Sequence, residues 1–126
     1  MPIRVNVDPQ ANLITLTGNG RLTYHGFKTA FEERVNHPHY QPGMDILYDL
    51  RTATIDMTLP ELKQGIALFK TRQEERGSNF RFAVVVTQVS AYGLVSLYQA
   101  HAQDLPEEIR IFDNLTAARQ WLEIEE

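Results

Sequence analysis

The chain has 126 residues, of which 43% are hydrophobic and 22% charged, a composition typical of one globular domain spanning residues 1–126. Its formal net charge of −4 argues against sequence-independent binding of nucleic acid, which requires a basic surface. The absence of cysteine excludes disulfides and thiolate chemistry, and it fits a soluble, cytoplasmic protein.

The first half of the chain predicts a β-hairpin and then a helix. Residues 3–8 alternate apolar and polar side chains, and residues 13–18 form the returning strand after the turn sequence DPQAN. The stretch GNGRLT at residues 18–23 is interpreted as a turn followed by a helix cap at Thr23, because the third glycine of a dinucleotide-binding loop is missing. The helix that follows has apolar residues at helical spacing, namely Phe27, Ala30, Phe31 and Val35.

A third strand at residues 46–50 precedes a second helix. Thr58 and Glu61 have the Thr-x-x-Glu spacing of a capping box, which predicts that the helix begins at residue 59. Gly77 stands where a glycine commonly ends a helix. One side of this helix is apolar (Leu62, Ile66 and Phe69) and its edge is basic (Lys63, Lys70, Arg72 and Arg76).

The second half of the chain adds two strand–helix units. Residues 81–87 form a continuous apolar strand, as expected at the centre of a sheet covered on both faces. Ser90 is expected to cap a third helix, and Asp113 a fourth, on either side of a strand at residues 109–112. The order is β-β-α-β-α-β-α-β-α, an α/β fold with a mixed five-stranded sheet and about four helices. The third helix carries Leu94, Leu97, Tyr98 and His101, and the fourth Leu115, Ala118, Trp121 and Leu122.

This order, together with HPHYQPGMDILYDLR, RFAVVV, YGLVSLY and IRIFDNLTAARQWL, resembles the SpoIIAA-like family of small bacterial proteins. That family is grouped with STAS domains and compared with the lipid-binding SEC14 fold. In STAS antagonists of anti-sigma factors, an Asp-Ser-Ser-Gly motif carries a phosphorylated serine. Here the matching stretch is IDMTLPE, in which Asp56 matches the aspartate and Met57 stands at the serine position. The resemblance therefore implies a regulatory fold without the usual phosphorylated serine.

Thr58 is the only hydroxyl in that stretch, and it has two interpretations. A phosphate on Thr58 would lie at a helix N-terminus, where free N–H groups favour negative charge. The same hydroxyl is explained by helix capping, and Asp56 would repel a phosphate. Capping is the favoured interpretation.

Polar residues elsewhere offer few routes to catalysis. Asp49, Arg51 and Asp56 are expected at the carboxyl edge of the third strand, as ligand contacts or as an ion pair that holds a loop. His37 and His39 would need a third ligand to hold a metal, so neither a metal nor a cofactor is predicted. No serine nucleophile motif is present, and the chain is expected not to be an enzyme.

The favoured function is a binding module for a small apolar or lipid-like molecule, held between the sheet and the helix that begins near residue 59. Arg51 or Tyr92 would contact the polar end of this ligand, and peripheral membrane contact through the helix stays open. The alternative is a STAS-type module that binds a protein partner, including a second copy of itself in a homodimer. The apolar wall is expected to contain Leu62, Ile66, Phe69 and Tyr98.

Overall fold

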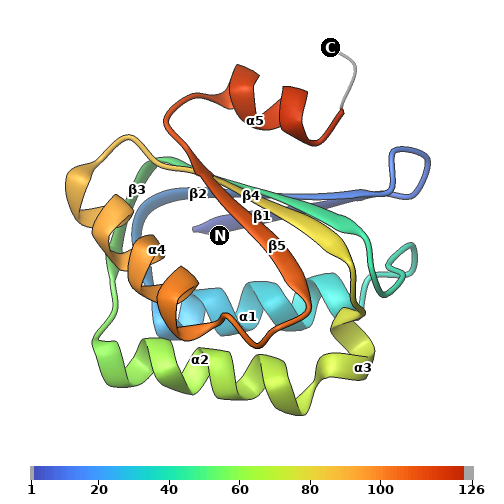
Figure 1. Cartoon of the computed structure of the whole chain (residues 1–126), viewed down its shortest axis with the longest axis horizontal. Helices are drawn as coiled ribbons and strands as arrows, with labels where there is room; N and C mark the ends of the chain where they lie inside the picture. The colour runs from blue at the N-terminus through green and yellow to red at the C-terminus, as the bar shows by residue number, and fades with distance from the viewer. Residues whose placement is uncertain (1, 124–126) are drawn as a thin grey trace.

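The computed structural model describes residues 2–123 and contains one mixed five-stranded sheet (Figure 1). The strands follow one another across the sheet in chain order. The first pair is antiparallel and the other three pairs are parallel, which confirms the predicted fold class. The strands are β1 (Ile3–Asp8), β2 (Leu13–Thr23), β3 (Asp45–Asp56), β4 (Phe80–Val85) and β5 (Glu107–Phe112).

Three consecutive parallel connections place their helices on one face of this sheet (Figure 1). Connections between parallel strands are almost always right-handed, so connections that advance in one direction across a sheet all cross the same face. The final helix follows the last strand and covers the opposite face. The helices are α1 (Tyr24–Val35), α2 (Leu59–Thr71), α3 (Gln73–Arg76), α4 (Val89–His101) and α5 (Leu115–Trp121).

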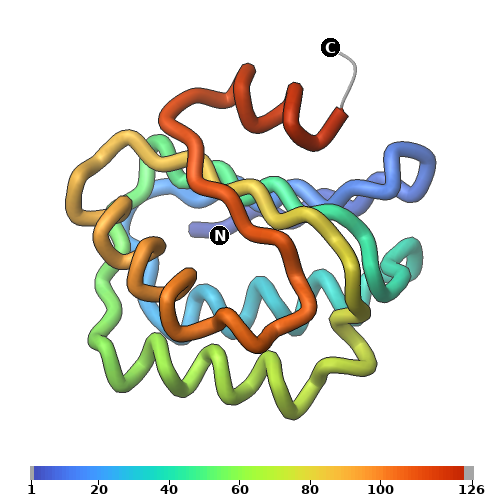
Figure 2. The backbone as a smooth tube through the Cα atoms, viewed as in Figure 1, coloured from blue at the N-terminus to red at the C-terminus, as the bar shows by residue number. Residues whose placement is uncertain are grey.

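On the three-helix face, α2 forms an outer layer. The inner helix α1 packs against β1 and β2, and α4 packs against β3 and β5. A helix about 10 Å wide covers roughly two strands spaced about 4.8 Å apart, so α1 and α4 already cover most of the sheet. The middle helix α2 therefore packs on α1 and α4, as the backbone trace in Figure 2 shows.

Strands β2 and β3 are longer than the sequence predicts. The predicted strands at residues 13–18 and 46–50 continue to Thr23 and Asp56, so residues 18–23 are strand and the predicted turn there is wrong. A register shift between Thr17 and Asn19 allows the two strands to curl towards the helices. Residues 19–23 and 52–56 pair with one another beyond the β3–β4 ladder, and we call this extension the β2–β3 arm.

The apolar strand β4 packs on both faces, as the sequence predicts. Its Phe82 and Val84 belong to the core on the α1 and α4 side. Ala83 and Val85 face α5, where the core is completed by Leu13, Leu47, Ala118 and Leu122. Among residues 2–123, no helix combines the length and apolar character needed to cross a bilayer.

Two of the predicted N-terminal helix caps are confirmed and two are wrong. The hydroxyls of Thr23 and Thr58 accept hydrogen bonds from backbone N–H groups in the first turns of their helices, and Thr58 forms the complete capping box. Helix α4 instead begins after Gln88, so Ser90 lies inside it. Asn114 caps α5 in place of Asp113, because its side-chain oxygen reaches the Ala117 N–H at 2.8 Å.

The single helix predicted for residues 59–76 is divided at Arg72 into α2 and the one-turn α3. The Arg72 guanidinium is held by Glu75 and by Glu32 of α1, which anchors the break against the neighbouring helix. The short α3 then directs Arg76 into the interior, where this residue is 2% exposed. This division explains why the structure has five helices rather than four.

The turn after α3 depends on Gly77. Its φ of 80° and ψ of −170° belong to a region that is essentially restricted to glycine. A Cβ atom there would lie 2.2 Å from the backbone nitrogen of Gly43. We expect Gly77→Ala to lower the free energy of unfolding by about 2 kcal/mol or more, as measured by urea denaturation.

The matched control is Gly93→Ala in α4, where an added Cβ meets no atom within 4 Å. Alanine favours a helix by about 1 kcal/mol over glycine, so this variant should be as stable as the wild type or more stable. Equal stabilities of the Gly77→Ala and Gly93→Ala proteins would contradict this account of the turn.

Candidate functional site

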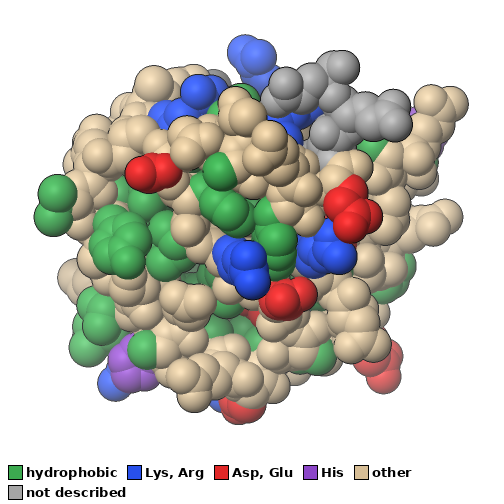
Figure 3. Space-filling model, turned by 45° about the horizontal axis from the view of Figure 1, so that its top comes forward, with side chains coloured by type: hydrophobic (Ala, Val, Ile, Leu, Met, Phe, Trp, Pro, Cys, Tyr) green, Lys and Arg blue, Asp and Glu red, His purple; other side chains and the backbone are tan. Residues whose placement is uncertain are grey.

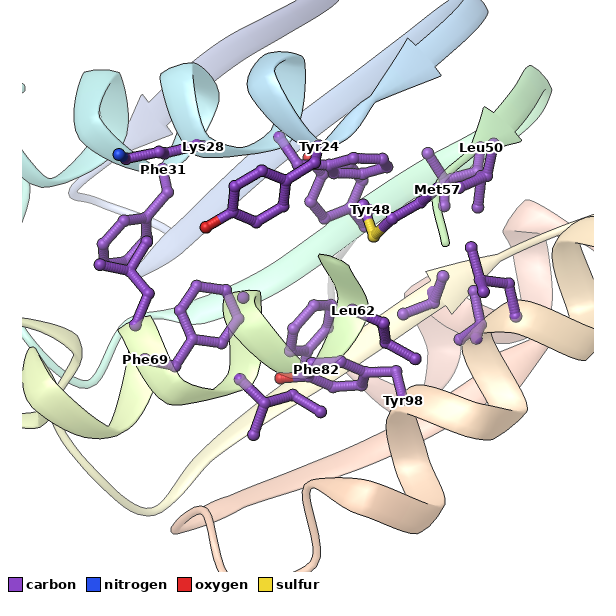
Figure 4. Close-up of a pocket in the computed structure, with 18 of the residues that line it drawn as sticks. Tyr24, Lys28, Phe31, Tyr48, Leu50, Met57, Leu62, Phe69, Phe82 and Tyr98 are labelled. Carbon is purple, nitrogen blue, oxygen red and sulfur yellow. The ribbon is translucent and has the colours of Figure 1, made fainter. Parts of the chain in front are cut away.

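A cavity of about 130 Å³ lies beneath α2 (Figure 4). The outer position of α2 leaves this space above the sheet, between α1 and α4. The end of the β2–β3 arm closes one side with Ile55 and the following Met57. The remaining lining residues come from α1, β3, α2, β4, α4 and β5, and include Tyr24, Phe27, Phe31, Tyr48, Leu62, Ile66, Phe69, Phe82, Leu94 and Tyr98.

The cavity wall is apolar and rich in aromatic rings. The rings of Phe31 and Phe69 lie 5.1 Å apart, and that of Phe82 lies 6.2 Å from Tyr98. Lys28 is the only charged residue among those that line the cavity. A cavity of this character holds water poorly, because a buried water molecule needs two to four polar partners. The space is suited to a small apolar molecule.

The hydroxyls of Tyr48 and Tyr98 remain neutral at physiological pH. Burial raises the pKa of Tyr48 above its ordinary value. Burial also raises the pKa of Tyr98, and the nearby Glu107 carboxylate reinforces that rise. The Tyr98 hydroxyl donates a hydrogen bond of 3.0 Å to Glu107 Oε2, so it is already occupied.

A buried charged cluster adjoins the cavity on the far side of Phe69. The Arg76 guanidinium lies 4.0 Å from the centre of the Phe69 ring, and its Nη2 group is paired with Glu107. The side chains of Arg76 and Glu107 are 0% and 1% exposed. Arg34 of α1 is also buried, with its guanidinium 4.9 Å from the Phe31 ring.

Four of the residues predicted for the ligand site line the cavity, namely Leu62, Ile66, Phe69 and Tyr98. They were identifiable because their apolar side chains recur at helical spacing within two of the predicted helices.

The other predicted site residues lie elsewhere. Asp49 and Arg51 form a two-bonded ion pair on β3, with both N···O distances at 2.9 Å, and this pairing lowers the pKa of Asp49 against the opposing effect of its burial. Asp56 is bound instead by Arg21, at 2.6 Å from Nε, because β3 continues seven residues past Asp49. Tyr92 is 55% exposed. These four residues do not line the cavity.

The histidine pair is a local turn feature. His37 Nδ1 accepts a hydrogen bond from the His39 backbone N–H at 3.1 Å. Within the described part of the chain, no three His, Asp or Glu side chains gather as metal ligands.

The predicted basic edge of the second helix is reduced in the structure. Arg76 is buried and Arg72 is held by two glutamates, so Lys63 and Lys70 remain. Lys70 in turn pairs with Asp104 at 2.8 Å. Figure 3 shows a different face, with α5 turned towards the viewer, and this face carries both basic and acidic side chains.

The buried cluster of Arg34, Arg76 and Glu107 was missed at the sequence level. Arg34 follows Ala30 and Phe31 at helical spacing, a signal that places it on the buried face of α1. The sequence pattern did not place Arg76 in the interior. The break at Arg72 changes which side of the following helix, α3, faces inward.

Comparisons with known proteins agree with this fold. The model of the SpoIIAA-like family matches residues 13–123. A crystal structure of an uncharacterized DUF3478-family protein with a SpoIIAA-like fold, from Shewanella loihica PV-4, superposes with a TM-score of 0.60 and 16% sequence identity. The match covers 95% of this chain and 91% of that one. No curated protein sequence matches the chain significantly. The shared fold is compatible with a regulatory module that binds a protein partner.

Proposed function

The chain belongs to the SpoIIAA-like family, and we propose that it is a non-enzymatic module that binds a small apolar molecule in the cavity beneath α2. The observation that carries the proposal is a cavity with almost entirely apolar walls. Apolar cavities of similar size stay dry and accept molecules such as benzene.

The size of the cavity limits the ligand. At about 130 Å³ it is smaller than the roughly 300–1,000 Å³ of sites for drug-sized ligands. A six-carbon chain fits this space. Burying it gains about 5 kcal/mol at about 0.8 kcal/mol per methylene, which corresponds to a Kd of roughly 0.2 mM.

A longer, lipid-like ligand requires α2 to move outward. This helix packs on other helices rather than on the sheet, and its capping box is internal to it, so α2 moves without breaking a strand pairing. Such a movement exposes Leu62 and Ile66, at a cost of roughly 1.5–3 kcal/mol each. An acyl chain that covers the same side chains offsets this cost, and α2 then acts as a lid.

We expect α2 to bind a membrane surface only weakly. The helix presents Lys63 and Lys70, with Leu59 40% exposed at its beginning. Each lysine near an anionic bilayer contributes about 1 kcal/mol, which supports a transient encounter during ligand exchange rather than stable attachment.

Gly65 provides a direct test, because it lines the cavity and an added Cβ would lie 3.5 Å from the Tyr24 ring. We expect Gly65→Leu to fill the cavity and weaken 1-hexanol binding about tenfold or more, in an NMR titration of the methyl signals of Leu62 and Ile66. Its unfolding free energy should be unchanged or higher, since cavity filling and removal of a helical glycine both stabilise.

Gly93→Leu is the matched control, a glycine-to-leucine change on a helix surface with open space around it. It should bind 1-hexanol as the wild type does. A folded Gly65→Leu protein with wild-type affinity would contradict the proposed location of the site.

A second candidate function is a protein-interaction module, favoured by exposed apolar side chains at the beginning of α4. Val89 is 89% exposed and Tyr92 is 55% exposed. A homodimer through this surface would show sedimentation that depends on concentration in the wild type and less so in Val89→Ser. Monomeric wild-type protein at high concentration would contradict the homodimer.

A further inference from the structure

The buried arginine cluster beside the cavity has more positive than negative charge. Arg34 and Arg76 are 3% and 2% exposed, and Glu107 is the carboxylate paired with Arg76 in the described structure. One oxygen of Glu107 accepts from Arg76 and the other accepts from the Tyr98 hydroxyl. Glu107 therefore neutralises one guanidinium, and the second remains uncompensated.

Several N–H groups of the cluster have no partner. Arg34 Nε and the Nε and Nη1 groups of Arg76 are buried without a hydrogen bond in the part of the chain that the structure describes. Both guanidinium groups lie over the Phe69 ring, with Cζ of Arg76 4.0 Å and Cζ of Arg34 5.9 Å from its centre. A cation–π contact attracts the positive charge but provides no hydrogen-bond acceptor for the unpaired N–H groups.

Arg34 stays charged at neutral pH. Burial and the neighbouring positive charge of Arg76 lower the pKa of Arg34 to about 10, which still leaves it protonated. Burying a charge without an acceptor is strongly unfavourable, and an incoming anion would relieve this cost. A carboxylate matches the geometry, since its two oxygens accept parallel hydrogen bonds from one guanidinium.

The cluster lies one aromatic side chain from the apolar cavity. Phe31 and Phe69 line that cavity, and the same two rings contact Arg34. Figure 4 shows Phe31 and Phe69 close together at one end of the lining, opposite Leu50 and Met57. The molecule thus holds an apolar space and, beyond one end of it, a cationic group that lacks an anion.

Building on the function proposed above, we propose that the ligand is an apolar carboxylate. Its tail occupies the cavity beneath α2, and its carboxylate accepts hydrogen bonds from Arg34 and from the free N–H groups of Arg76. A turn of the Phe69 side chain would open the cavity towards the cluster. Arg34 and Arg76 thus take the role that the sequence had assigned to Arg51 and Tyr92, the contact with the polar end of the ligand.

The test compares ligands that share one tail. Hexanoate, which is ionised at neutral pH, 1-hexanol and hexylamine are titrated against the wild type by NMR. We expect hexanoate to bind at least about tenfold more tightly than 1-hexanol. A hydrogen bond to a charged group changes an affinity by about this factor. Hexylamine should bind most weakly of the three, because it adds a further positive charge to a cluster that already has more positive than negative charge.

Arg34→Met is the informative variant, because this arginine has no carboxylate partner among the described residues and its removal strands no buried negative charge. We expect the preference for hexanoate over 1-hexanol to disappear in this variant. Arg76 is unsuitable, since its removal leaves Glu107 buried and unpaired. The comparison of ligands on the wild type does not depend on the folding of the variant.

The outcomes separate this inference from the proposed function. Equal affinities for hexanoate and 1-hexanol overturn the inference and leave the apolar site intact. Acetate binding as tightly as hexanoate also overturns it, because the tail then contributes nothing. Failure of all three six-carbon ligands to bind overturns the proposed function itself.

Discussion

The structure depends on one topological constraint: three right-handed connections in succession bring three helices to the same face of a five-stranded sheet. Two of these helices, α1 and α4, cover most of the strands, and α2 packs above the groove between them. The space beneath α2 follows from this layering. It is lined by the inward faces of all three helices and of the sheet, so its walls are apolar for the same reason that any core is apolar.

The sequence was sufficient to predict the fold class and the apolar half of the site. Period-two and helical patterns located the five strands and the main helices, and the helical spacing of Leu62, Ile66 and Phe69 identified the inward face of α2. The polar half could not be predicted in this way. Asp49, Arg51 and Asp56 were grouped because β3 was expected to end near residue 50, whereas it continues in the β2–β3 arm, which tertiary pairing with β2 stabilises.

The buried arginines show where local pattern fails. A helix predicted through residue 76 places Arg76 on its basic edge, but the break at Arg72 turns the next residues and buries Arg76 against Phe69 and Phe80. Burial of more positive than negative charge is unfavourable for folding alone. One amphipathic ligand that contacts both the charged cluster and the adjacent apolar cavity would explain why the two lie side by side.

The most direct measurement is native mass spectrometry of the freshly purified protein, followed by solvent extraction and identification of any released molecule. The account predicts a one-to-one complex with a small apolar acid in the wild type and a bare protein mass for Gly65→Leu, in which the cavity is filled. A bare mass for both proteins, even after incubation with a lipid extract, would contradict the claim that the cavity beneath α2 is a binding site.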